Sequence, residues 1–318
     1  MPGNYSADTA LTDARETDIV IPIMGVTGAG KSSFINTLLD HFGIVKRFEV
    51  GSALASCTSQ LESVVIEGQT NNWRRIRGHR IIIVDTPGFD NTYAECFETL
   101  QQIARWLEES YRKKMVLGGV IYLHDISQTR LTGTARGDLE IFNRLCGESA
   151  LDKVVLVTSH WGTAPEQNFD KREEELKKRY WNTMMDGGAR VERLVAGEEQ
   201  ASAWKIVHSI LERVETRAIQ QIRSEGLQIQ RELVDQRKLL PQTHAALELR
   251  AHFEQMIEAQ TRMQALKAAG SAEAMAQLEE HEAKVKQMAQ QIENMKAPFP
   301  MRLVQWIKLV VGRWIWAG

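Results

Sequence analysis

The 318-residue chain lacks several features that define common protein classes. It has no run of about twenty apolar residues, so no segment is expected to cross a bilayer as a helix. Its three cysteines are an odd number without metal-ligand spacing, which fits a reducing compartment. Neither sign of charge dominates, because the net charge is -2, and we expect no nucleic-acid partner. The polar residues 1–17 lack the apolar stretch of a signal peptide, and they predict a disordered arm on a cytoplasmic protein.

A glycine-rich loop is the most informative feature that is present. Residues 25–33 read GVTGAGKSS, between an apolar run and an apparent helix, and they match the phosphate loop G-x-x-x-x-G-K-[ST]. Glycine lets the backbone curl so that successive N–H groups face a phosphate chain. We expect Lys31 to reach the β- and γ-phosphates and assist catalysis, and the Ser32 hydroxyl to ligate Mg²⁺. The predicted nucleotide-binding residues of this loop are Gly25, Thr27, Gly28, Ala29, Gly30, Lys31, Ser32 and Ser33.

A second motif follows the apolar residues 80–84. The sequence Asp85-Thr86-Pro87-Gly88 has the D-x-x-G pattern, in which the Asp85 carboxylate joins the Mg²⁺ shell and the Gly88 N–H meets the γ-phosphate. Between the two motifs lies the segment Ser56-Cys57-Thr58-Ser59. A hydroxyl in this position completes the Mg²⁺ octahedron and senses the γ-phosphate. We favour Thr58 as this metal ligand and catalytic residue, with Ser56 and Ser59 as alternatives.

Short β-branched runs alternate with amphipathic stretches from residue 18 to residue 212. This alternation predicts an α/β domain with a doubly wound, mostly parallel sheet, the P-loop G domain. We expect strands at 19–24, 61–67, 80–84, 117–123, 153–158 and 190–195. We expect helices at about 31–40, 94–113, 135–146 and 168–184, with another from Ser202. Pro22 is unexpected in the first strand, because proline cannot donate to a central ladder.

The composition changes after about Trp204, where proline and glycine nearly vanish. Helices are predicted at 202–239, 243–268 and 272–296, which gives an all-α or coiled-coil region over 213–297. Apolar residues recur at heptad spacing in the last of these helices, and a similar stripe precedes it. The two sets are Leu278, Val285 and Ile292, and Leu249, Phe253, Met256 and Met263. The stripes fit either a helical hairpin packed within the chain or an intermolecular coiled coil.

The last segment, 298–318, predicts an amphipathic helix. Its apolar side carries Trp306 and Trp314, and Arg302, Lys308 and Arg313 take the other side. Basic amphipathic helices with tryptophans bind membrane interfaces, so peripheral membrane contact is one expectation. Packing against the rest of the chain is the other.

Together these motifs resemble the septin-related GTPases of the immunity-associated and chloroplast-import-receptor type. The carriers are GVTGAGKSSFIN, SCTS and DTPGFDNT, and the segments GGVIYLHDISQTRLTG, IFNRLCG and VVLVTSHW are similar to fungal G-domain proteins with a C-terminal coiled coil. The resemblance covers about residues 18–212. It implies binding of GTP and GDP with Mg²⁺, modest hydrolysis, and dimerisation or assembly in the GTP state.

The chain departs from the usual G-domain pattern where the base is read. The expected [NT]KxD motif is replaced by Val157-Thr158-Ser159-His160-Trp161, which has no lysine and no aspartate. The import-receptor relatives resemble this sequence, which implies that His160 contacts the base, although a surface or helix-capping role is equally open. A further base-side loop is predicted near Gly197 and Ala201-Ser202-Ala203.

The position after D-x-x-G also departs, because Phe89 stands where Ras-type enzymes carry a water-orienting glutamine. Arg130 could stabilise charge in a neighbouring protomer, or it could be an ordinary exposed arginine. The sequence therefore leaves three functions open: a slow GTPase switch, a non-catalytic GTP-dependent scaffold, and an ATPase.

Overall fold

The computed structural model describes residues 8–50, 60–88, 96–128, 131–162, 168–217 and 225–267, and within 286–295 residues 286, 288–292 and 295. Among these residues, seven strands form one sheet in the order β2-β3-β1-β5-β6-β7, with the short β4 paired to β1. The strands are β1 (Ile19–Met24), β2 (Glu62–Ile66), β3 (Ile81–Asp85), β4 (Val116–Leu117), β5 (Val120–Asp125), β6 (Val154–Ser159) and β7 (Arg190–Arg193). All pairs are parallel except β2 with β3. The predicted doubly wound α/β fold is confirmed.

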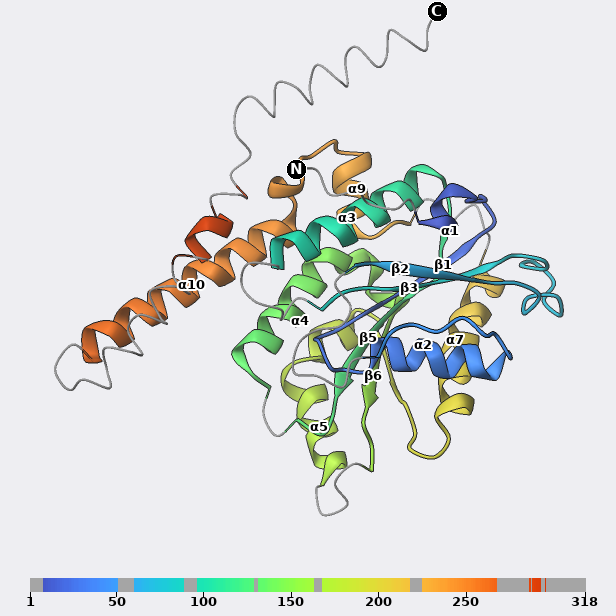
Figure 1. The fold of residues 1–318 in the computed structure, drawn as a ribbon, viewed down its shortest axis with the longest axis horizontal. Coiled ribbons are helices and arrows are strands. Elements are labelled where there is room, and N and C mark those ends of the chain that lie inside the picture. The colour runs from blue at the N-terminus through green and yellow to red at the C-terminus, as the bar shows by residue number, and fades with distance from the viewer. Residues whose placement is uncertain are drawn as a thin grey trace, which may run out of the picture.

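Helices cover both faces of the sheet (Figure 1). One apolar core forms between the sheet and α2 (Lys31–His41) with α7 (Glu199–Thr216), and it includes Phe34 and Ile210. The opposite core lies under α3 (Cys96–Arg112) and α4 (Gly133–Cys146), and it includes Leu100 and Phe142. The predicted helix at 168–184 is two helices, α5 (Phe169–Arg179) and α6 (Asn182–Asp186), because the backbone turns at the buried Trp181.

Pro22 is accommodated by a break in the neighbouring strand. Ile19 N donates to Arg80 O at 2.8 Å on one side of β1, whereas Val20 O accepts from Gly118 N at 3.0 Å on the other. Because these sides alternate along a strand, the N–H that Pro22 lacks would face the side of β4 and β5. That partner is interrupted at Gly118–Gly119, and the pairing register shifts by one residue there. The expected strand at 117–123 is therefore two strands.

The residues before β1 form part of the domain. Helix α1 (Thr9–Thr12) buries Ala10 and Leu11 in the core under α3. The carboxylate of Asp8 accepts hydrogen bonds from Ser63 of β2 and from the Trp106 indole of α3. The prediction of a disordered arm is wrong for residues 8–17, because two short apolar side chains and a bonded carboxylate are enough to anchor them. Residues 1–7 lie outside the described residues.

The predicted helix 202–239 is also interrupted. Helix α7 ends at Thr216, and α9 (Gln228–Val234) begins after an extended Leu227. Helix α9 packs on α3, and α10 (His244–Lys267) packs on α4. The orange helices of Figure 1 therefore lie against the first domain.

Apolar side chains of the helical region belong to the core under α3 and α4. Leu249 and Phe253 of α10 are buried there, together with Met288 and Met295 of the third predicted helix. For these residues the structure supports packing within the chain over an intermolecular coiled coil. Most of 272–296 and all of 298–318 lie outside the described residues, so the amphipathic C-terminal helix stays a prediction. No helix in the described part of the chain is long and apolar enough to cross a membrane.

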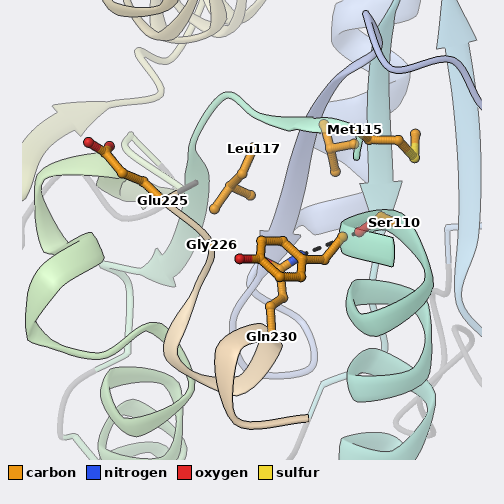
Figure 2. A pocket seen from close by; sticks show the side chains of 8 residues that line it. Ser110, Met115, Leu117, Glu225, Gly226 and Gln230 are labelled. Atoms are coloured by element: carbon orange, nitrogen blue, oxygen red, sulfur yellow. Dashed lines mark hydrogen bonds between the residues drawn. The ribbon is translucent and has the colours of Figure 1, made fainter. Parts of the chain in front are cut away.

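A buried amide joins the helical region to α3 (Figure 2). Gln230 Nε2 donates to Leu107 O at 2.8 Å, and its Oε1 accepts from Leu227 N at 2.9 Å. A cavity of about 10 Å³, room for roughly one water molecule, lies beside this contact. It is lined by Val20, Ser110, Tyr111, Met115, Leu117, Glu225, Gly226 and Gln230. Its position under α9 separates it from the phosphate loop.

Candidate nucleotide site

The predicted site residues that the structure describes gather where parallel strands end. The carboxyl ends of β1, β3, β5 and β6 lie at one edge of the sheet, because their registers run side by side. Ligands of open α/β sheets bind in the crevice outside this edge. Thr58, its alternatives Ser56 and Ser59, Phe89 and Arg130 lie outside the described residues, so their predicted roles stay predictions.

The phosphate loop connects β1 to α2. Gly28 and Gly30 have φ of +80° and +89°, a region that suits glycine. Gly25 has φ +136°, and a Cβ there would lie 2.2 Å from Leu123 O of β5. Glycine at this position therefore allows β1 and β5 to approach closely where the loop begins. The loop places Lys31 at the first residue of α2, where backbone N–H groups are free to bind an anion.

Lys31 is buried against its own loop. Its side chain is 6% exposed, and Nζ donates to Gly25 O at 2.9 Å and to Val26 O at 3.0 Å. Burying an ammonium group is costly unless it is bonded, so these carbonyls hold the charge in place. The arrangement positions a cation at the loop, as the sequence predicts.

Ser32 and Asp85 meet as the two motifs predict. Ser32 Oγ donates to Asp85 Oδ2 at 2.6 Å across 53 residues of sequence. Asp85 is 1% exposed, and its Oδ1 is buried without a hydrogen-bond partner among the described residues. Burial raises the pKa of Asp85 to about 6, although the Ser32 hydrogen bond and the charge of Lys31 oppose that rise.

These oxygens fit Mg²⁺. The ion is hard, takes oxygen ligands, and usually binds one or two protein groups together with phosphate oxygens and water. Ser32 Oγ and Asp85 supply a hydroxyl and a carboxylate at one point, and the buried Oδ1 is the unsatisfied atom that a cation would satisfy. Ser32 and Asp85 are therefore the residues that would hold the ion, and Thr58 stays a predicted third.

Two hydroxyls that the sequence reasoning did not single out fasten the site. Thr86 Oγ1 donates to Ile23 O at 2.8 Å, which ties the D-x-x-G turn, including Gly88, to the end of β1. Ser159 Oγ donates to Ala29 O at 2.8 Å, which ties the end of β6 to the phosphate loop. A hydroxyl that follows a run of buried strand residues is a weak signal, because such residues often bond only their own backbone.

His160 stands beside the phosphate loop. Its φ is +60°, and its Cε1 lies 3.3 Å from the position that a Cβ of Gly30 would occupy. The structure therefore brings His160 to the predicted site from the end of β6. The role of a base contact is not decided by this placement.

The predicted base-side loop follows β7. Leu194 N donates to Thr158 O at 2.8 Å, so the loop begins beside the end of β6. The Ser202 hydroxyl accepts from Val195 N at 3.1 Å and donates to Glu198 O at 2.9 Å, so it closes the loop itself. The assignment of this loop to the base stays a prediction.

A parallel α/β sheet with a G-x-x-x-x-G-K-S loop after β1 and a D-x-x-G turn after β3 defines a P-loop G domain. Residues 20–160 match the model of the family described as 50S ribosome-binding GTPase. This part of the chain is thus the G domain of a P-loop GTPase.

Solved structures of G proteins resemble the chain at low identity. Toc33 from Arabidopsis thaliana with Mg²⁺ and GMPPNP is 19% identical, with a TM-score of 0.46, over 63% of this chain and 85% of that one. Toc33 with GDP and Mg²⁺ is 17% identical, with a TM-score of 0.38, over 59% and 68%. Elongation factor SelB from Methanococcus maripaludis with GppNHp is 11% identical, with a TM-score of 0.39, over 61% and 34%. A search of curated proteins found no significant match.

Proposed function

We propose that this chain binds GTP and GDP with Mg²⁺, hydrolyses GTP slowly, and acts as a nucleotide-gated switch or assembly module. The contact between Ser32 Oγ and Asp85 Oδ2, next to the buried Asp85 Oδ1, carries the proposal. When bound, Mg²⁺ neutralises charge on the β- and γ-phosphate oxygens. Lys31 holds the phosphate chain, and the loop N–H groups orient it. The match of residues 20–160 to a GTPase family supports guanine as the base.

GTP and GDP should bind at least tenfold more tightly than ATP, which corresponds to about 1.4 kcal/mol. The reason is the family match, set against the absence of an aspartate from the base-reading segment. Competition titrations of the full chain with a fluorescent GDP analogue, in Mg²⁺, measure the ratio. Equal affinities would remove the guanine assignment and favour the ATPase alternative.

Turnover by the dilute protein should be slow, at about 10⁻³ s⁻¹, the scale of G domains without an activating partner. Phenylalanine at position 89 can neither donate nor accept a hydrogen bond to the attacking water, whereas the charge of Lys31 and Mg²⁺ remains. Phosphate release at several protein concentrations measures the rate. A rate near 1 s⁻¹ in dilute protein would contradict the handicap assigned to Phe89, and no turnover with intact binding would favour the scaffold.

Dimerisation is the finer part of the proposal, and it rests on the resemblance of the motifs to GTPases that assemble in the GTP state. If a second copy supplies Arg130, specific activity rises with protein concentration, and Arg130→Ala removes that rise without changing GTP affinity. A concentration-independent rate that Arg130→Ala leaves unaltered would exclude this arrangement.

A further inference from the structure

The hydroxyl of Ser159 decides which ring nitrogen of His160 carries hydrogen. Ser159 Oγ lies 2.8 Å from Ala29 O, 3.2 Å from His124 O and 3.1 Å from His160 Nδ1. The two carbonyl oxygens can only accept, so the single hydroxyl hydrogen is directed to one of them. Toward His160 the hydroxyl can then only accept. Nδ1 must therefore be the donor, and it carries the hydrogen.

A carboxylate reinforces the same tautomer. Asp125 Oδ1, at the end of β5, lies 3.5 Å from His160 Nδ1. The carboxylate is itself fixed, because it accepts from Ser127 N at 2.8 Å and from Gln128 Nε2 at 2.9 Å. A carboxylate beside one imidazole nitrogen stabilises hydrogen on that nitrogen. Two independent acceptors from two strands thus converge on Nδ1.

The backbone also holds the ring in place. A φ of +60° costs a non-glycine residue about 1 kcal/mol, and such strain persists where the surroundings determine the conformation. In this conformation the ring edge that carries Cε1 lies against Gly30. Gly30 directly precedes Lys31, and the loop N–H groups here cradle the α- and β-phosphates. A side chain beside Gly30 is therefore placed to meet the nucleoside part of the ligand.

We propose that Ser159 and Asp125 are positioning residues that keep hydrogen on Nδ1 of His160, and that this tautomer gives the site its preference for guanine. With hydrogen on Nδ1, the Nε2 atom is a hydrogen-bond acceptor. The ring edge of guanine offers N–H donors at N1 and N2, whereas adenine presents an acceptor at N1. An Nε2 acceptor fits guanine, and an Nε2–H donor would fit adenine. The base preference rests on the proposed function, but the tautomer does not.

The tautomer can be measured without nucleotide. Nitrogen-15 ring spectra of histidine in the full-length protein distinguish hydrogen on Nδ1 from hydrogen on Nε2, and His160→Asn assigns the signals. The wild-type ring should show hydrogen on Nδ1. In the double variant Ser159→Ala/Asp125→Asn, both tautomers should appear, whereas Ser159→Thr should retain the wild-type pattern. Hydrogen on Nε2 in the wild-type protein would overturn the proposal.

Base preference is the second readout. The ratio of the dissociation constants for ATP and GTP should fall roughly three- to tenfold in the double variant, the range of one net hydrogen bond. A merely structural loss would weaken both nucleotides equally and leave the ratio unchanged, which would overturn the specificity role. Asp235→Asn is the matched control, because that carboxylate accepts from Tyr111 on α3 and should leave the ratio unaltered.

The two readouts keep this proposal separable from the broader function. If the wild-type protein binds neither nucleotide, the proposed function fails, while the ring spectra still decide the tautomer. If GTP is preferred but the double variant keeps the full preference, only the role of Ser159 and Asp125 fails. Should Ser159→Ala prevent folding, Asp125→Asn alone decides, because its side-chain oxygen can still accept from Ser127 N and hold the loop.

Discussion

Replacing Lys31 with alanine should lower the affinity for GTP and GDP by about a hundredfold or more. The ammonium group makes charge-assisted contacts with phosphate oxygens, each of which contributes about 1.5–3 kcal/mol. Its bonds to Gly25 O and Val26 O show that the group already stands at the loop, so little reorganisation precedes binding. Two such contacts correspond to a factor of about a hundred in the dissociation constant.

Isothermal titration with GDP and Mg²⁺ measures this loss. Lys205→Ala is the matched control, because Lys205 is exposed on α7 and its loss removes the same charge from the chain. The control should bind as the wild-type protein does. If Lys31→Ala bound within threefold of the wild type, the phosphate loop would not be the nucleotide site.

Replacing Arg80 with methionine should destabilise the domain by about 3–5 kcal/mol, which is the cost of leaving one partner of a buried ion pair uncompensated. Arg80 Nε and Nη2 donate to Asp18 at 2.8 Å and 2.7 Å, and Asp18 is fully buried. Arg80 Nη2 also donates to Asp13 O, so the same guanidinium fastens the chain before β1. A loss of this size is a large share of the 5–15 kcal/mol that stabilises a typical domain.

Urea unfolding of the full chain measures the effect. Arg112→Met is the control, because its ion pair with Glu108 on α3 is largely exposed and should contribute at most about 1 kcal/mol. The double variant Asp18→Leu/Arg80→Met should be more stable than Arg80→Met alone, since no buried charge remains. A single variant within 1 kcal/mol of the wild type would mean that Asp18 finds another partner.

The sequence was sufficient for the sheet and the phosphate site because both depend on local patterns. Alternating buried runs predict the parallel strands, and fixed spacings predict that Ser32 and Asp85 meet. The break at Gly118–Gly119 had a signal, since two adjacent glycines within an apolar run are typical of a bulge. Read together with Pro22, the glycine pair also explains how proline fits a central strand.

Other features depend on contacts that distant segments make, and these were not visible in the sequence. Residues 8–17 look like a polar arm because their anchors, Arg80 and Trp106, lie far away in sequence. Asp125 carries no motif, and its position near His160 arises only because β5 and β6 pair in register. The interruption after Thr216 follows from packing of α9 on α3, which helical propensity alone does not encode.

The packing of α9 and α10 also determines when the domain can be completed during synthesis. The apolar side of α3 and α4 is made by residue 146, but the side chains that cover it, Leu249 and Phe253, are added about a hundred residues later. Until then a ribosome-bound chain presents that surface to water, a state in which unfinished proteins aggregate or recruit chaperones. A protein truncated at Thr216 would keep the phosphate loop and every described strand, yet it would retain this unfinished surface permanently.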